Sequence, residues 1–177
     1  MFTLSMSDRP FSVPNPIDGL APTAASDDTA ALKNIRFAAM GLLARREHAQ
    51  NELRQKLRRR FDQHELIEVV IQALADGSWQ SDERFAEAFV ASRIRKGQGP
   101  IRIAMELRER GIRDDLVAAF VDSSDHSWKS LAADVRERRF GAECPTDVKA
   151  KAKQMRFLQY RGFTPEQVRA SLNQNSW

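Results

Sequence analysis

Cysteine and histidine are scarce in this sequence of 177 residues. Cys144 is the single cysteine, and the three histidines are His48, His64 and His126. One cysteine cannot form an internal disulfide, and the histidines have no zinc-like spacing with it. We therefore expect a reduced, cytoplasmic protein that has no structural metal and no cofactor.

Long apolar runs and catalytic motifs are missing as well. No apolar run approaches the roughly 18 residues that a membrane-spanning helix needs, and the N-terminus lacks a charged region followed by an apolar core. The sequence has no glycine-rich phosphate loop, no His-Glu-x-x-His or Cys-x-x-Cys motif, and no serine or cysteine near a histidine in a recognisable nucleophile context. Adjacent acids at 82–83 and 114–115 are typical of helix starts. We predict no membrane contact, no export signal and no enzymatic activity.

Alternating apolar residues, the pattern of a β-strand, do not occur either. Proline is concentrated near the N-terminus. Four of the seven prolines lie within the first 28 residues, and none occurs between positions 28 and 99. We predict a disordered tail at 1–28, because this segment has no periodic apolar stripe. Leu32, Ile35, Ala39 and Leu42 have the spacing of one buried helical face, which predicts a first helix near 28–45.

A repeat of about fifty residues dominates the remaining chain. The segments 52–61, 105–112 and 155–163 are similar to one another, and Leu57, Leu107 and Leu158 lie 50 and 51 residues apart. Each segment reads as a basic helix end, a turn and a second helix, which is the pattern of stacked helical units. We predict an all-α protein, an elongated and curved array of tandem three-helix, helix-turn-helix-like units at 29–77, 81–122 and 126–175.

The turns of the three units differ in one residue. Gly111 and Gly162 lie where a left-handed C-terminal cap needs a residue without a Cβ, whereas the first unit has no glycine there and should turn differently. Asp62 followed by Glu65, and Thr164 followed by Gln167, have the pattern of capping boxes. Both pairs are predicted to begin the last helix of their unit.

Positive charge is concentrated in the middle of the chain. Residues 1–32 carry a net charge of −3, residues 33–113 carry +6 and residues 114–177 carry +1. Such a stretch favours a polyanion, either nucleic acid or an acidic protein groove. The candidate binding residues are nine cations near the turns: Arg58, Arg59, Arg60, Arg93, Arg95, Lys96, Arg102, Arg108 and Arg110.

These cations have competing interpretations. The 58–60 run suits a helix C-terminus even without a ligand, whereas the cluster around the Gly97–Pro100 turn should repel itself unless a phosphate or carboxylate is bound. Glu106 and Glu109 are expected to neutralise part of the line that runs to Arg113. We expect the aromatic residues Trp79, Tyr160 and Phe163 to lie in the core rather than to stack on nucleic-acid bases.

Several motifs in this order resemble the bacterial RecX family. They are the segments 42–48, 52–57, 82–86, 92–99 and 157–163, and the resemblance covers residues 29–174. It implies a regulator of the RecA recombinase that is built of three-helix repeats and lies along the groove of the RecA–ssDNA filament. It also implies that the chain restrains ATP hydrolysis, strand exchange and LexA self-cleavage, and thereby recombination and the SOS response. The absent glycine near Arg60 and the tail at 1–28 depart from the family pattern.

Two other classes of function stay open. Three-helix units with a glycine turn are also typical of helix-turn-helix DNA-binding proteins, but the helices after the turns carry only one arginine, Arg169. An inert helical scaffold is the third reading. On the preferred reading we expect a monomer that binds RecA protein and the RecA–ssDNA filament, and that binds bare ssDNA and dsDNA weakly.

Overall fold

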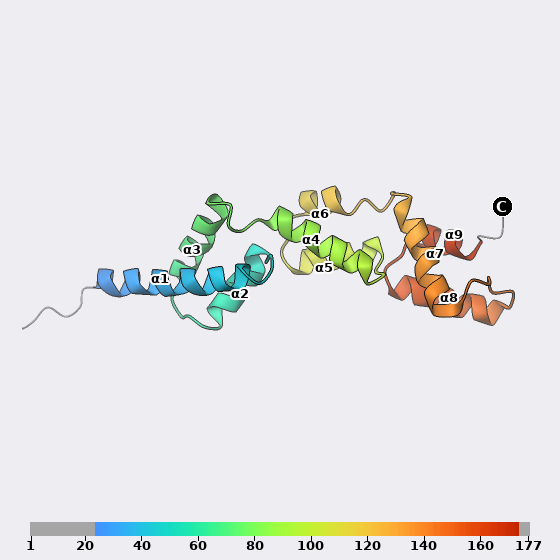
Figure 1. The fold of residues 1–177 in the computed structure, drawn as a ribbon, viewed down its shortest axis with the longest axis horizontal. Helices are drawn as coiled ribbons and strands as arrows, with labels where there is room; N and C mark the ends of the chain where they lie inside the picture. The colour runs from blue at the N-terminus through green and yellow to red at the C-terminus, as the bar shows by residue number, and fades with distance from the viewer. Residues whose placement is uncertain (1–23, 174–177) are drawn as a thin grey trace, which may run out of the picture.

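The computed structural model describes residues 24–173, and this part of the chain is entirely helical, without strands (Figure 1). The helices are α1 (Ala24–Leu43), α2 (Gln50–Arg58), α3 (His64–Asp76), α4 (Asp82–Arg95), α5 (Pro100–Glu109), α6 (Asp114–Phe120), α7 (Ser127–Phe140), α8 (Val148–Tyr160) and α9 (Pro165–Leu172). None of these described helices is long and apolar enough to cross a membrane.

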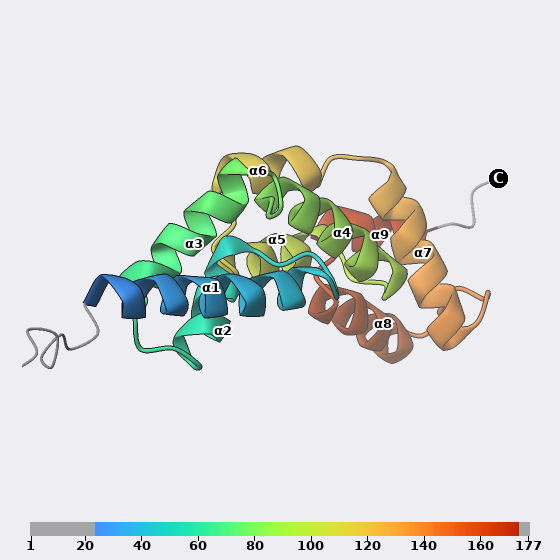
Figure 2. The ribbon, with the colours of Figure 1, turned by 60° about the vertical axis from the view of Figure 1, so that its left-hand side comes forward.

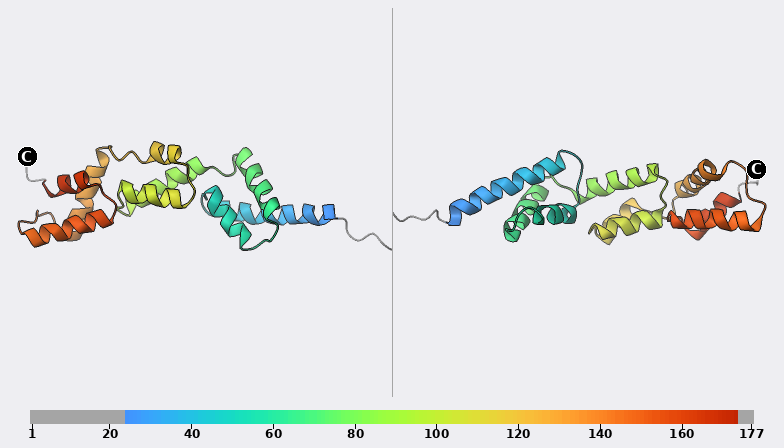
Figure 3. Two further views of the ribbon diagram at one scale, coloured as in Figure 1. Left: turned by 180° about the vertical axis from the view of Figure 1, so that it is seen from behind. Right: turned by 90° about the horizontal axis from the view of Figure 1, so that it is seen from below.

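The helices pack in consecutive groups of three. Helices α1, α2 and α3 contact one another, α6 packs on α4 and α5, and α7 packs on both α8 and α9. The three groups lie in an extended row from α1 to α9 (Figures 1 and 2), and the same row is seen from behind and from below in Figure 3. The predicted all-α repeat fold is confirmed. We call the three groups the first, second and third units.

The first helix begins earlier than the sequence predicts. Helix α1 starts at Ala24, so residues 24–28, which we assigned to the tail, are helical. The rest of the predicted tail, 1–23, lies outside the described residues. The predicted limits of the three units are not tested further and stay a prediction.

Each unit is held by its own apolar core, and the repeated leucines are central to these cores. Leu57, Leu107 and Leu158 are 1%, 0% and 0% exposed. The cores nevertheless interlock: Ala49, just before α2, packs into the core of the second unit, as does Trp128 of α7. The indole Nε1–H of Trp128 donates to the carbonyl oxygen of Asp122 at 2.7 Å, so its burial leaves no unpaired donor.

The turn glycines adopt the backbone geometry that their positions predict. Gly111 and Gly162 have φ angles of +80° and +89°, and the next residue in each case donates its N–H to a helix carbonyl five residues back, at 3.2 Å. This is the closing bond of a left-handed helix cap. The first unit ends α2 differently: Arg60 does not have a positive φ, and Phe61 donates its N–H to the Leu57 carbonyl four residues back, at 2.9 Å. The expected difference of the first turn is confirmed.

One of the two predicted capping boxes is present. The Thr164 hydroxyl accepts from the Gln167 N–H, and the Gln167 side chain accepts from the Thr164 N–H. The prediction for Asp62 is wrong, because α3 begins two residues later: the Asp62 carbonyl accepts from the His64 N–H, and no side chain caps this helix. Asp82 lies in the first turn of α4 and also contacts the preceding unit. Its carboxylate accepts from the N–H of Gln50 at 2.9 Å and so caps the start of α2.

The second and third units meet backbone to backbone. Gly99 donates its N–H to the Arg161 carbonyl at 2.8 Å, and Ile101 donates to the Gly162 carbonyl at 3.0 Å. A Cβ on Gly162 would lie 2.4 Å from the Cβ of Arg102, and a Cβ on Gly99 would lie 2.5 Å from the Gly162 backbone. Only glycine allows this approach, so the two units have one close and fixed arrangement.

The first and second units meet in a related way. A Cβ on Gly111 would lie 2.9 Å from the Cβ of Asn51, in the first turn of α2. Gly162 likewise faces Arg102, in the first turn of α5. In both junctions the turn glycine of one unit abuts the start of the second helix of the unit before it. The first unit has no preceding unit among the described residues, and its turn has no glycine.

Candidate functional site

Glu106 on α5 organises the predicted cluster around the Gly97–Pro100 turn. Its carboxylate lies 2.7 Å from Nε of Arg93 on α4 and 3.1 Å from Nε of Arg102. Burial disfavours ionisation of Glu106, but the hydrogen bonds from the two arginines outweigh it and lower the pKa of this carboxyl. Glu106 therefore neutralises part of the basic line, as predicted. It also explains without a ligand why Arg93 and Arg102 can lie together.

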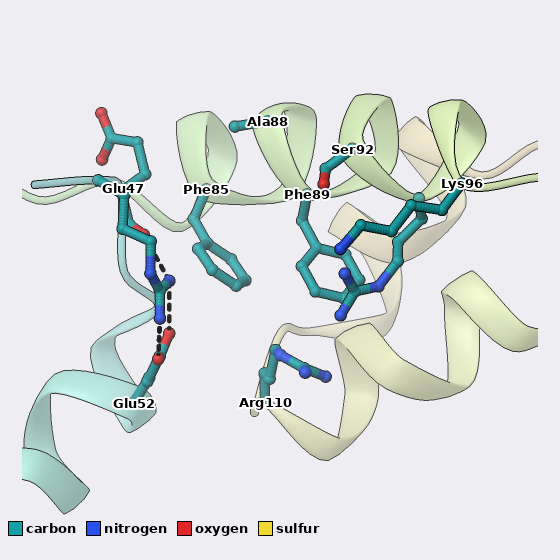
Figure 4. A pocket seen from close by; sticks show the side chains of 10 residues that line it. Glu47, Glu52, Phe85, Ala88, Phe89, Ser92, Lys96 and Arg110 are labelled. Carbon is teal, nitrogen blue, oxygen red and sulfur yellow. Dashed lines mark hydrogen bonds and ion pairs between the residues drawn. The ribbon is translucent and has the colours of Figure 1, made fainter. Parts of the chain in front are cut away.

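Phe89 of α4 provides a second partner for two of the predicted cations. The guanidinium carbons of Arg93 and Arg110 lie 4.2 Å and 4.6 Å from the centre of its ring. Arg110 also donates to the Glu106 carbonyl oxygen at 2.5 Å. Figure 4 shows Arg110 reaching toward the Phe89 ring from the end of α5. These interactions fix α4 against α5, so Arg93 and Arg110 stabilise the second unit.

A cleft of about 430 Å³ lies between the first and second units, beside this cluster (Figure 4). Acids and bases both line it: Arg46 and Lys96 face it together with Glu47 and Glu52. Arg46 is paired with Glu52. Burial alone would raise the pKa of the Glu52 carboxyl. The hydrogen bond and positive charge of Arg46, followed by the charges of His48 and Lys56, have the larger effect, so the pKa of Glu52 lies below its usual value. Arg93 and Arg110 line the cleft as well, so four cations and two carboxylates face it. Arg46 and Arg93 are paired with acids, whereas Lys96 and Arg110 have no acidic partner within 4.0 Å in the described part of the chain.

The predicted basic run at 58–60 lies apart, at the end of α2 in the first unit (Figure 1). Arg58 is paired with Glu68 of α3 at 3.1 Å. Arg59 and Arg60 are exposed and have no acidic partner within 4.0 Å in the described part of the chain, although Arg60 lies over the Phe61 ring. The structure does not bring this run together with the cluster at the Gly97–Pro100 turn.

Arg108 lies in the last turn of α5 and is likewise occupied. Its Nε lies 2.6 Å from the carboxylate of Asp114, and Arg113 pairs with Asp115 at 2.9 Å. The acids at 114–115 begin α6, as the sequence predicts. Because all four side chains are more than half exposed, these pairs contribute little to stability.

A second cleft, of about 250 Å³, lies between the second and third units. Five of the eight residues that line it are cations, and none is acidic: Arg95, Lys96, Arg138, Arg139 and Arg161. Arg95 and Lys96 come from the end of α4, Arg138 and Arg139 from the last turn of α7, and Arg161 from the end of α8. We call this the basic cleft. Two of the nine predicted cations line it, Arg95 and Lys96. Lys96 also lines the cleft between the first and second units, into which Figure 4 shows its side chain directed.

The other three cations of the basic cleft were missed from the sequence. Arg138 and Arg139 stand before a glycine at a helix end, and Arg161-Gly162 repeats the Arg110-Gly111 pair of the second unit. That repetition was the available signal for Arg161. The convergence of α4, α7 and α8 had no sequence signal, because it depends on how two units stack.

The aromatic residues at the unit boundaries do not all lie in the core. Phe163 is 1% exposed, as expected, but Trp79 is 57% exposed and Tyr160 is 80% exposed. The prediction of burial is wrong for the last two. Tyr160 ends α8 next to Arg161, where the neighbouring unit packs through glycine and leaves no space for a large ring between the backbones. The Arg102 guanidinium lies 5.6 Å from its ring centre.

Fold and surface together define the class of this protein. It is an elongated helical-repeat protein with cations gathered at the junctions of its units, and its described residues contain no group of histidines, cysteines and carboxylates that could hold a metal ion. Two family models match the chain: "RecX, second three-helix domain" over residues 81–119, and "RecX, third three-helix domain" over residues 130–172.

Known proteins agree with these matches. The chain is 47% identical over 146 residues to "Regulatory protein RecX" of Halorhodospira halophila, which covers 82% of this chain and 91% of that protein. It is 40% identical over 134 residues to the protein of the same name from Pseudomonas fluorescens, covering 76% of this chain and 86% of that protein. The chain belongs to the RecX family.

A solved structure has the same fold. The crystal structure of RecX from Lactobacillus salivarius superposes with a TM-score of 0.68 at 19% sequence identity, covering 82% of this chain and 95% of that one. At this identity the superposition shows that the fold is shared.

Proposed function

We propose that this protein binds in the groove of the RecA–ssDNA filament and inhibits RecA. The inhibited activities are ATP hydrolysis, strand exchange and the promotion of LexA self-cleavage. The protein thereby restrains recombination and the SOS response in the cytoplasm. Membership of the RecX family supports this assignment, since relatives at up to 47% identity carry the name of a regulatory protein.

One structural observation carries the proposal: three units stand in a fixed row with cations at their junctions. An extended row can contact several protomers of a filament at once, and each additional contact is then intramolecular. We therefore expect a monomer to inhibit RecA at fewer than one copy per RecA protomer. A polyanionic groove made of DNA phosphate and acidic protein surface suits the cations that have no acidic partner among the described residues.

The alternative is a helix-turn-helix protein that reads duplex sequence without RecA. Helices α3, α6 and α9 are the ones that follow the turns, and Arg169 on α9 is the single arginine among them. A major-groove reader needs several arginine, asparagine or glutamine side chains directed at base edges. This composition favours filament binding over sequence-specific duplex binding.

Parallel binding measurements separate the two functions. Labelled RecA–ssDNA filament, the same ssDNA alone and duplex DNA are titrated with the protein at several salt concentrations. We expect the filament to bind most tightly and to show the weakest salt dependence, because contacts to RecA release no counterions. Equal affinities and equal salt slopes for filament and bare ssDNA would contradict recognition of RecA.

A further inference from the structure

We propose that the basic cleft between the second and third units binds the phosphate backbone of single-stranded DNA. The ligand is a run of phosphodiester groups, and the residues that contact it are Arg95, Lys96, Arg138 and Arg139, with Arg161 behind them. This site rests on the proposed function, because the RecA filament would supply the single-stranded DNA.

The pairing of the cations is the first argument. Arg95, Lys96 and Arg139 have no acidic side chain within 4.0 Å in the described part of the chain, and Arg138 lies 3.9 Å from Asp134 at the edge of the cleft. Elsewhere Glu52, Glu68, Glu106 and Asp114 each hold one or two arginines. Uncompensated cations that line one small cleft repel one another, and a bound anion removes this repulsion.

Helix ends alone do not account for these cations. A basic residue in the last turn of a helix offsets the partial negative charge of the free carbonyls. At the end of α4 this role is already filled, because Arg161 Nη1 donates to the carbonyl oxygens of Lys96 and Gly97, at 2.8 Å and 3.3 Å. Arg95 and Lys96 are therefore left free for an external anion.

The cleft is held in shape before any ligand arrives. Gly97 has a φ of +69°, and a Cβ there would lie 2.7 Å from a Val135 methyl of α7, so the end of α4 lies against α7. The hydrogen bond from Gly99 to the Arg161 carbonyl fixes α8 at the same place. A site whose cations are positioned beforehand loses less entropy on binding than one on a mobile loop.

The lining of the cleft favours phosphate over an apolar protein segment. Five of its eight lining residues are cations, and two, Val135 and Phe157, are large apolar side chains. A phosphodiester group is compact and carries its charge on two exposed oxygens, which guanidinium and ammonium groups bind directly.

Tyr160 favours a single strand over a duplex. Its ring is 80% exposed at the end of α8, one residue before Arg161. Tyr160 does not itself line the cleft, and the Arg102 guanidinium lies 5.6 Å from its ring centre. An exposed ring that is flanked by cations is a surface on which an unpaired base can stack. In a duplex the bases are covered by their neighbours, so this ring could take part only with a single strand.

The test compares two variants that lose the same charge. The cleft variant carries Arg95→Gln, Lys96→Gln and Arg139→Gln. The control carries Lys33→Gln, Arg36→Gln and Arg45→Gln, which change exposed cations of the first unit that have no acidic partner within 4.0 Å in the described chain. Binding of a labelled oligothymidine is measured by fluorescence anisotropy against salt, after circular dichroism has shown that both variants fold.

We expect the cleft variant to lose about tenfold or more in affinity, and its salt slope to fall by about 2, since each lost phosphate contact contributes about 0.7 on a single strand. The control should stay near the parent. With a methylphosphonate oligonucleotide, whose backbone is neutral, the parent and the cleft variant should bind alike. Tyr160→Ala should weaken oligothymidine binding by about fivefold or more.

Three outcomes would overturn the assignment. Equal losses in both triple variants would mean that net charge alone attracts DNA. An unchanged affinity of the cleft variant for oligothymidine, combined with weaker binding to the RecA filament, would mean that the cleft meets acidic protein. Unchanged binding to both would mean that it meets neither. A parent protein that binds oligothymidine through the cleft and leaves RecA unaffected would instead refute the proposed function and keep this site.

Discussion

The two junctions between units use the same glycine position and differ in everything around it. At the first junction Gly111 meets a side chain, Asn51, and the units are tied through side chains: Gln80 donates to the His48 carbonyl at 3.1 Å, and Arg84 pairs with Glu47 at 2.8 Å. At the second junction glycine meets backbone, and backbone N–H to carbonyl bonds are added to side-chain ties such as that from Arg161 to the Lys96 carbonyl.

Their electrostatics differ in the same way. The cleft at the first junction contains both carboxylates and cations, whereas the cleft at the second contains cations alone. Carboxylates offset part of the positive charge of the first cleft, and no lining carboxylate does so in the second. The two junctions thus share the position of a glycine and differ in whether carboxylates lie among the cations of the adjoining cleft.

The largest expected effect is on the second junction itself. Gly162→Ala places a Cβ 2.4 Å from that of Arg102 at a φ of +89°. The left-handed backbone costs about 1–2 kcal/mol and the overlap about 1–3 kcal/mol, so we expect a loss of about 2–5 kcal/mol in the free energy of unfolding. Chemical denaturation measures the loss, and small-angle scattering should show the third unit displaced.

Gly141 supplies the matched control for this prediction. Its φ is +93°, but a Cβ there would meet nothing within 4 Å. Because its ψ is 170°, Gly141 has an extended backbone that is nearly exclusive to glycine, so Gly141→Ala reports a backbone cost without overlap, about 1–3 kcal/mol. If Gly162→Ala were no more destabilising than Gly141→Ala, the close approach of the two units would not be a constraint.

A smaller effect separates two neighbouring arginines. Arg93→Ala removes a half-buried partner of Glu106 and the contact with Phe89, so we expect it to destabilise the protein by about 1–3 kcal/mol. Arg95→Ala removes an exposed cation without an acidic partner in the described chain and should change stability by less than about 0.5 kcal/mol. Thermal melts of the two variants measure this contrast, and equal melting temperatures would contradict the division between structural and free cations.

Mild acid should weaken the first junction and spare the second. Burial lowers the pKa of His48 below its usual 6.5, and the neutral ring accepts from Lys56 at 3.1 Å while Nδ1–H donates to the Arg46 carbonyl. Below pH 6.5 the unfolded chain binds a proton that the folded chain does not, so stability falls as the pH falls. The lowered pKa of Glu52 continues this loss below pH 4.5.

The measurement is the free energy of unfolding between pH 7.5 and about 5.5. The effect is expected to be the smallest of the three and to disappear in His48→Gln, which keeps a neutral acceptor and donor. His64→Gln changes an exposed histidine and should keep the parent's profile. A profile that stays the same in His48→Gln would show that this histidine is not the titrating group.

Much of the fold was predictable because repetition shows in the sequence. The leucines at 57, 107 and 158 and the turn glycines at 111 and 162 mark core positions and left-handed caps, which depend on local backbone and burial alone. The errors fell at element ends. Asp62 lies two residues before α3, and α1 begins at Ala24. The first residue of a helix depends on the geometry of the turn before it, which the sequence pattern does not determine.

The candidate site was predictable only in part. Arg95 and Lys96 were found because they stand beside a glycine turn, and Glu106 was expected to neutralise part of the basic line, but the sequence does not show that Glu106 of α5 pairs with Arg93 of α4. Arg138 and Arg139 lie more than 40 residues from Lys96 along the chain and reach it only through stacking of the units. Which side chains meet across a junction depends on how the units pack, so the sequence of one unit does not predict it.

The central claim is that this protein restrains RecA through its cationic junction. The most direct measurement is the ssDNA-dependent ATPase of RecA, titrated with the parent, with the cleft variant and with the charge-matched control of the first unit. The account predicts inhibition by the parent and the control at less than one copy per RecA protomer, and much weaker inhibition by the cleft variant. An ATPase rate that is unchanged by a large molar excess of the parent would contradict it.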